Sequence, residues 1–165
     1  MNKPLRILLG VCAVVLITAL VIANRRGTAA ADDLAAKKQL TVESGGKELV
    51  YDYDESSDSY RTFPAKMTKK NGDAFDREYS GIELVAILGG LGIDITYGSS
   101  VRAVCADNYE VELTGTEVLE PGNIYIVTRE GGEPLPDGDG PFMMVICHDE
   151  FSTRWARQIV KIITE

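Results

Sequence analysis

Residues 101–113 restrict the fold of this chain more than any other stretch, because two runs that alternate apolar and polar residues meet at Asp107-Asn108. Successive side chains of a strand point to opposite faces, so this alternation predicts two strands, each with one buried face. Asn108 tolerates the positive φ that a tight corner needs. The stretch therefore predicts a β-hairpin whose buried face carries Val101, Ala103, Cys105, Tyr109, Val111 and Leu113.

The rest of the chain predicts several short strands and one good helix. Ser80 and Glu83 have the spacing of a capping box, and the apolar residues after them predict a helix that ends at Gly89-Gly90. Residues 66–77 are polar and are interpreted as an excursion without regular structure. The fold class is therefore β-rich α+β, with further strands expected at 40–42, 47–53, 60–64, 124–129, 142–147 and 159–164.

The amino-terminal part predicts a membrane segment. Residues 7–23 are uncharged and rich in Leu, Val, Ile and Ala, with Lys3 and Arg6 before them and Arg25 and Arg26 after them. This length is at the lower end of what spans a bilayer as a helix. We expect residues 1–31 to form the anchor with its flank, 32–39 a stalk, and 40–165 the folded domain.

The charges around residues 7–23 set the expected location. The positive charges before the apolar run place the amino terminus inside the cell and the domain outside it, on a single-pass membrane protein. The alternative is a signal segment cleaved after Ala29-Ala30-Ala31, which would give a secreted protein.

The chain beyond the amino-terminal segment is acidic. All 25 Asp and Glu residues follow position 31, against 13 Lys and Arg residues, which gives this part a formal charge of −12. Such a charge excludes nucleic acid as a partner, and it excludes binding to anionic lipid through a basic patch.

Four motifs in order resemble the oxidoreductase molybdopterin-binding domain, which has the sulfite-oxidase-like fold. The first is the run from Tyr79-Ser80-Gly81-Ile82-Glu83-Leu84 to Gly92-Ile93, and the second is the corner Asp107-Asn108-Tyr109. The others are Gly132-Glu133-Pro134-Leu135-Pro136 leading to Gly140-Pro141, and Phe151-Ser152-Thr153-Arg154-Trp155. The resemblance covers residues 40–165 and implies a compact β-rich domain that in active relatives holds a molybdenum-pterin cofactor.

The resemblance also implies a site, which this chain matches only in part. The family's metal-binding cysteine comes shortly before the Gly81-Ile82 helix start, but residues 66–78 contain no cysteine. Ser152 and Arg154 match the phosphate-holding end, where Arg154 would make a bidentate contact. Asp107 and Tyr109 match the corner motif. The alternatives are a surface arginine beside a core Trp155, and a Tyr109 that belongs to the core.

Cys105 and Cys147 are the cysteines outside the amino-terminal segment. Outside the cell they would form a disulfide worth about 2–4 kcal/mol, or remain two buried thiols. A further alternative is a zinc or copper site made by Cys147-His148-Asp149 together with Cys105. A cysteine nucleophile activated by His148 would have to be Cys105.

These observations lead to one functional expectation with a rival. The chain is expected to be a cofactor-free binding or accessory module at the cell surface, with a small anionic ligand or a surface protein as its partner. The rival is a redox enzyme that keeps a molybdenum-pterin cofactor, with Cys105 as an unusual metal ligand and Arg154 on the phosphate.

Overall fold

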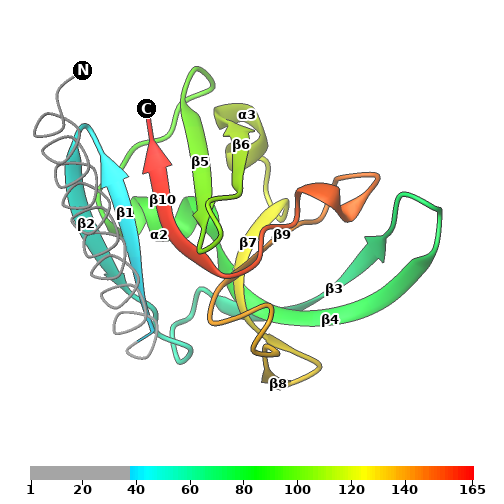
Figure 1. Ribbon diagram of the computed structural model, residues 1–165. Coiled ribbons are helices and arrows are strands. Elements are labelled where there is room, and N and C mark those ends of the chain that lie inside the picture. Colours follow the sequence, from blue (N-terminus) through cyan, green and yellow to red (C-terminus); the bar gives the residue numbers. More distant parts are fainter. Residues whose placement is uncertain (1–37) are drawn as a thin grey trace, which may run out of the picture. The chain divides into compact units, whose positions relative to one another are not determined.

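The computed structural model describes residues 38–165, which form two β-sheets and short helices (Figure 1). The first sheet has the strand order β2-β1-β10-β5-β6. Strand β1 runs parallel to β10, and the other neighbours are antiparallel. Its strands are β1 (Gln39–Ser44), β2 (Lys47–Asp52), β5 (Ser100–Cys105), β6 (Glu110–Thr114) and β10 (Ile159–Thr164).

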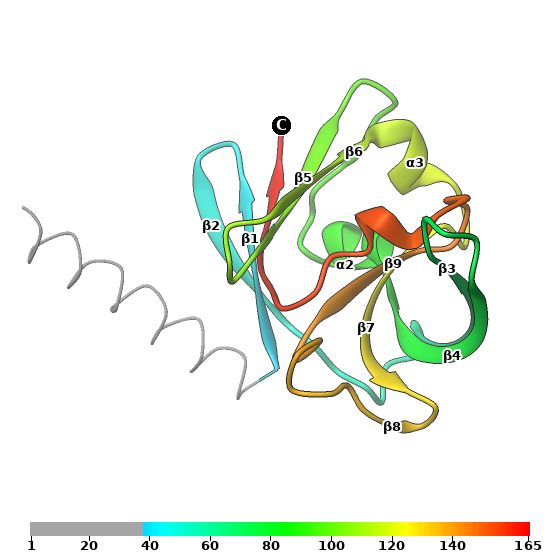
Figure 2. The same cartoon turned by 45° about the vertical axis from the view of Figure 1, so that its right-hand side comes forward.

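The second sheet has the order β3-β4-β7-β8, and β9 also pairs with β7. All its neighbours are antiparallel, and β3 and β4 form a long hairpin that curves away from the rest of the sheet (Figure 2). Its strands are β3 (Tyr60–Thr68), β4 (Ala74–Glu83), β7 (Ile124–Glu130), β8 (Glu133–Pro134) and β9 (Met143–Ile146). The helices are α2 (Leu84–Gly90), α3 (Gly115–Leu119) and the 3-10 turn η1 (Ser152–Arg154).

One apolar core joins the two sheets and α2, and this confirms the predicted β-rich α+β class. The core follows from the strand alternation, because Val101, Ala103 and Cys105 turn inward from β5 while Val111 and Leu113 turn inward from β6. Burial of such side chains is the main source of stability in a domain of this size.

The predicted hairpin at 101–113 is confirmed. Strands β5 and β6 pair with Arg102 opposite Glu112, and Asn108 has a φ of 65° at the corner. Tyr109 differs from the prediction, since 46% of its surface is exposed. It lies just outside β6, where its hydroxyl donates to the carbonyl of Thr153 at 3.4 Å instead of entering the core.

The polar excursion predicted at 66–77 is wrong, because these residues form the outer half of the β3–β4 hairpin. Lys66 pairs with Asp76, and the strands reverse where the amide of Lys69 donates to the carbonyl of Asp73 at 2.8 Å. Residues 74–78 are exposed on both faces, so this half of β4 lacks the apolar alternation that marks a half-buried strand.

The capping box predicted at Ser80 and Glu83 is also wrong. Residues 80–83 continue β4, and α2 begins only at Leu84. The Ser80 hydroxyl instead hydrogen-bonds the Thr62 hydroxyl at 2.8 Å across the hairpin. A capping box does occur at α3, where Thr114 and Glu117 bond each other's backbone amides. Pairing with β3 and β7 on both sides of β4 overrides the local helix signal.

The predicted membrane segment at 7–23, its flanks and most of the stalk lie outside the described residues. Within residues 38–165, no helix is long and apolar enough to cross a bilayer.

Tyr53 ties the end of β2 to the second sheet. Its buried hydroxyl accepts a hydrogen bond from the amide of Ile82 at 2.9 Å and donates one to the carbonyl of Ile126 at 2.5 Å. Ile82 and Ile126 face each other in β4 and β7, next to a register shift between Ser80 and Gly81. Gly81 must lack a side chain, since a Cβ there would overlap the Ile126 carbonyl oxygen.

We predict that Tyr53→Phe lowers the free energy of unfolding by about 2–4 kcal/mol, because it leaves a buried donor and a buried acceptor unpaired. Urea denaturation of the full chain measures this change. Tyr97→Phe is the control, since Tyr97 is 78% exposed and should change stability by less than about 0.5 kcal/mol. Equal effects of the two substitutions would contradict the bridging role.

Candidate functional site

A cavity of about 700 Å³ lies between the outer half of β4 and the segment 130–139. Asp76, Arg77, Glu78 and Tyr79 of β4 line one side, together with Met67 of β3. The other lining residues are Glu130, Gly131, Glu133, Pro134, Pro136, Asp139, Met143 and Arg157. The cavity therefore lies where β4 stops pairing with β7, whose last partners are Tyr79 and Glu130.

The lining of this cavity is acidic. Both of its arginines are paired, Arg77 with Glu130 at 2.8 Å and Arg157 with Asp139 at 3.0 Å. Asp76, Glu78 and Glu133 have no ion-pair partner among residues 38–165, so the lining carries three uncompensated negative charges. Burial, together with the neighbouring Glu130 carboxylate, raises the pKa of Tyr79 to about 12, which keeps its hydroxyl neutral.

The donor set of the cavity does not suit a molybdenum-pterin group. The resemblance places the metal-binding cysteine within residues 66–78, and part of this segment lines the cavity. The sulfur that it contributes is the thioether of Met67, and Met143 contributes a second thioether. Neither is a thiolate, the soft ligand that this metal takes in the family. Three uncompensated carboxylates would also repel the pterin's phosphate. Across 38–165, no group of three or more His, Cys, Asp or Glu residues is arranged to hold a metal ion.

Arg154 already holds two carboxylates. Its Nε donates to Asp149 Oδ2 at 2.9 Å, one terminal nitrogen donates to the other Asp149 oxygen, and that nitrogen also contacts Glu117 Oε1 at 2.7 Å. The hydrogen bond to Asp149 is the main cause that raises the pKa of Arg154, followed by the bond to Glu117. A bidentate carboxylate thus occupies the fork through which a phosphate would bind.

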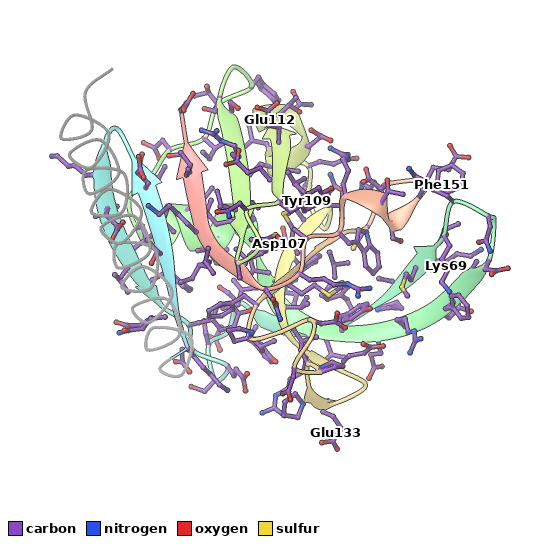
Figure 3. The ribbon with its side chains drawn as sticks, viewed as in Figure 1. Lys69, Asp107, Tyr109, Glu112, Glu133 and Phe151 are labelled. Atoms are coloured by element: carbon purple, nitrogen blue, oxygen red, sulfur yellow. The ribbon has the colours of Figure 1, made fainter. Side chains whose placement is uncertain are left out.

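The other predicted binding residues gather near η1 but not at the cavity. Ser152 Oγ accepts from the amide of Thr68 at 2.9 Å, and Tyr109 reaches Thr153, so Ser152, Arg154 and Tyr109 are brought together. Asp107 accepts from the Tyr109 amide at 2.9 Å and thereby closes the β5–β6 turn (Figure 3). None of the four lines the acidic cavity.

Cys105 and Cys147 are both free thiols. Cys105 is buried at the end of β5 in the first sheet, whereas Cys147 directly follows β9 in the second. Burial raises the pKa of each thiol to about 11, so neither is a ready nucleophile at neutral pH. His148 Nδ1 lies 2.9 Å from Glu120 at the surface.

The sequence did not single out the residues that line the cavity. Met67 and Asp76 fall in the stretch 66–77 that is interpreted as irregular, Glu78 directly follows that stretch, and Glu133 belongs to one of the four motifs. The alternation of Asp76 and Glu78 in the run 74–79 was the available signal. It gave no sign that the strand would face the segment 130–139.

Comparison with known proteins shows the fold. No family model matches this sequence, and no curated protein matches it. A solved structure similar to it is that of the sulfane dehydrogenase SoxCD from Paracoccus pantotrophus, with a TM-score of 0.62 and 17% sequence identity. The match covers 76% of this chain and 37% of that chain. This likeness supports the sulfite-oxidase-like fold that the motifs implied.

We predict that Glu117 and Arg154 are coupled by about 1 kcal/mol at neutral pH, a modest value because both side chains are partly exposed. Burial raises the pKa of Glu117, but bonds from the Thr114 backbone and from Arg154 outweigh it and lower the pKa below 4.5. The coupling is therefore fully present above pH 4.5, and it is lost as the pH falls through the lowered pKa of Glu117.

A double-mutant cycle of Glu117→Gln and Arg154→Gln, followed by urea denaturation across this pH range, measures the coupling. A coupling that persists in strong acid, or that is absent at neutral pH, would contradict the assignment.

We predict that iodoacetamide alkylates Cys105 and Cys147 slowly in the folded chain, and that the rate rises about tenfold per pH unit toward a pKa of about 11. After unfolding without reductant, both should react fully. Mass spectrometry of the separate peptides distinguishes them from Cys12. A requirement for reductant would show that the two thiols are bridged instead.

Proposed function

We propose that this chain is a binding module built on a sulfite-oxidase-like fold, that it acts without a molybdenum-pterin cofactor, and that its amino-terminal segment holds it at the outer face of a membrane. The observation that carries the proposal is the lining of the cavity next to β4. It offers three uncompensated carboxylates and two thioethers where the resemblance calls for a thiolate. Such a lining suits a cationic partner.

The second support is the state of the residues that match the family's phosphate end. Arg154 is neutralised by Asp149 and Glu117, and Ser152 is engaged by Thr68. To bind a phosphate, Arg154 would have to give up two charge-assisted hydrogen bonds, each worth about 1.5–3 kcal/mol. A small anionic ligand is therefore a poorer candidate than a protein partner.

The proposed location rests on the sequence before position 32. The uncharged run 7–23 has the length of a membrane helix, and the basic residues before it favour an outward-facing domain. An acidic surface on that side is compatible with a partner that carries basic segments.

The rival function, a molybdenum enzyme, is favoured by one observation, which is the fold shared with a sulfane dehydrogenase. In that case Cys105 would have to supply the thiolate. Cys105 is buried in the core and does not line the cavity.

We predict that the full chain, produced in a host that makes the cofactor, contains far less than one molybdenum per chain by elemental mass spectrometry. A known molybdenum enzyme made in the same host is the positive control. About one molybdenum per chain would overturn the proposal. If that metal were lost in Cys105→Ser but kept in Cys147→Ser, the rival enzyme would be established.

A further inference from the structure

The outer half of β4 has an unpaired backbone edge that faces the acidic cavity. On this side the carbonyl of Glu78 accepts from the amide of Gly131 at 2.8 Å, and pairing with β7 then continues only toward Glu83. Backbone groups two and four residues away on a strand point to the same side. The N–H and C=O groups of Asp76 and Ala74 therefore point toward the cavity, and within residues 38–165 they have no partner there.

The opposite edge of the same hairpin is protected. On β3 the outward positions are Pro64, Lys66 and Thr68, each paired across the hairpin with an outward position of β4. Pro64 has no N–H to offer, and the amide of Thr68 is taken by Ser152. Edge strands are commonly protected in this way against pairing with other chains. The edge at 74–78 lacks such protection.

The charges beside this open edge are negative. Asp76 and Glu78 alternate along the strand and share one face. Glu133, the first residue of β8 (Figure 3), also lines the cavity. Lys69 lies at the far end of the hairpin, where its ammonium group is 4.9 Å from the centre of the Phe75 ring, and neither residue lines the cavity. The two cavity arginines, Arg77 and Arg157, are neutralised by their partners.

We propose that an extended, basic segment of a partner protein adds to β4 as a further strand. This inference rests on the proposed function of the chain as a binding module. The backbone of the segment would pair with Ala74 and Asp76, up to the point where Gly131 already bonds the Glu78 carbonyl, and five residues at about 3.3 Å each span residues 74–78. Lys or Arg at alternate positions of the segment would reach Asp76 and Glu78. The backbone pairing gives affinity, and the alternating charges give selectivity and a dependence on salt.

The test uses the full chain in detergent and fluorescence anisotropy of a labelled six-residue peptide that alternates lysine and threonine. One comparison peptide has the same sequence with N-methyl groups on alternate amides, which blocks strand pairing but keeps the charge. A second comparison is competition by spermine, a polycation without a peptide backbone. We expect the plain peptide to bind at least about tenfold more tightly than the N-methylated one.

Two proline substitutions provide a matched pair of variants, because Lys66 and Asp76 face each other across the hairpin and both point their amides outward. Asp76→Pro removes an amide from the edge at the cavity, whereas Lys66→Pro removes one from the opposite edge. We expect Asp76→Pro to weaken binding about tenfold and Lys66→Pro to leave it within about twofold. Asp76→Asn, expected to weaken binding about threefold, separates the charge from the backbone. Circular dichroism verifies that each variant is folded.

The outcomes separate the inference from the proposed function. Equal binding of the plain and N-methylated peptides, with full competition by spermine, would overturn strand addition and leave only an acidic surface. Equal effects of Asp76→Pro and Lys66→Pro would overturn the choice of edge. Failure of the basic peptide to bind a chain without molybdenum would overturn this inference while the proposed function stands. Stoichiometric molybdenum would overturn both.

Discussion

The hydroxyl of Tyr53, inserted between the facing backbone groups of Ile82 and Ile126, is the contact on which the arrangement of the two sheets depends. It comes from the end of β2 in the first sheet and satisfies a donor and an acceptor in the second. Gly81 permits the close approach of β4 and β7 beside it. With β4 held at this point, its inner half pairs with β7, while its outer half continues past the end of β7 with one edge unpaired.

The position of the candidate site follows from this partial pairing of β4 with β7. Where β7 turns away at Glu130, a cavity opens between the free edge of β4 and the segment that follows. The family that the sequence motifs resemble would place a cysteine thiolate in the segment that lines this cavity. This chain has thioethers and uncompensated carboxylates instead. The same strand thus offers hydrogen-bonding groups and negative charge together, which is the chemistry that an extended basic peptide needs.

Much of the fold could be predicted from local pattern. The hairpin at 101–113 follows from alternation and from Asn108 at its corner, and the strands expected at 40–42 and 47–53 do pair with each other as β1 and β2. The outer hairpin of β3 and β4 could not be predicted, because its residues on β4 are exposed on both faces and lack the apolar alternation that marks a half-buried strand. The capping signal at Ser80 predicts a helix start that is too early, because the pairing of β4 with two strands outweighs it. The pairing of Arg154 could not be predicted, because Asp149 and Glu117 come together on its guanidinium group only in the folded chain.

The central claim is that the edge of β4 is open, and amide hydrogen exchange of the full chain by NMR tests it without any ligand. An open edge predicts that amide protection alternates along the strand. The amides of Ala74 and Asp76 should exchange at nearly unprotected rates, while those of Phe75 and Arg77, which point toward β3, should be protected. Equal protection of the Asp76 and Arg77 amides would show that this edge is already covered and could not take up a further strand.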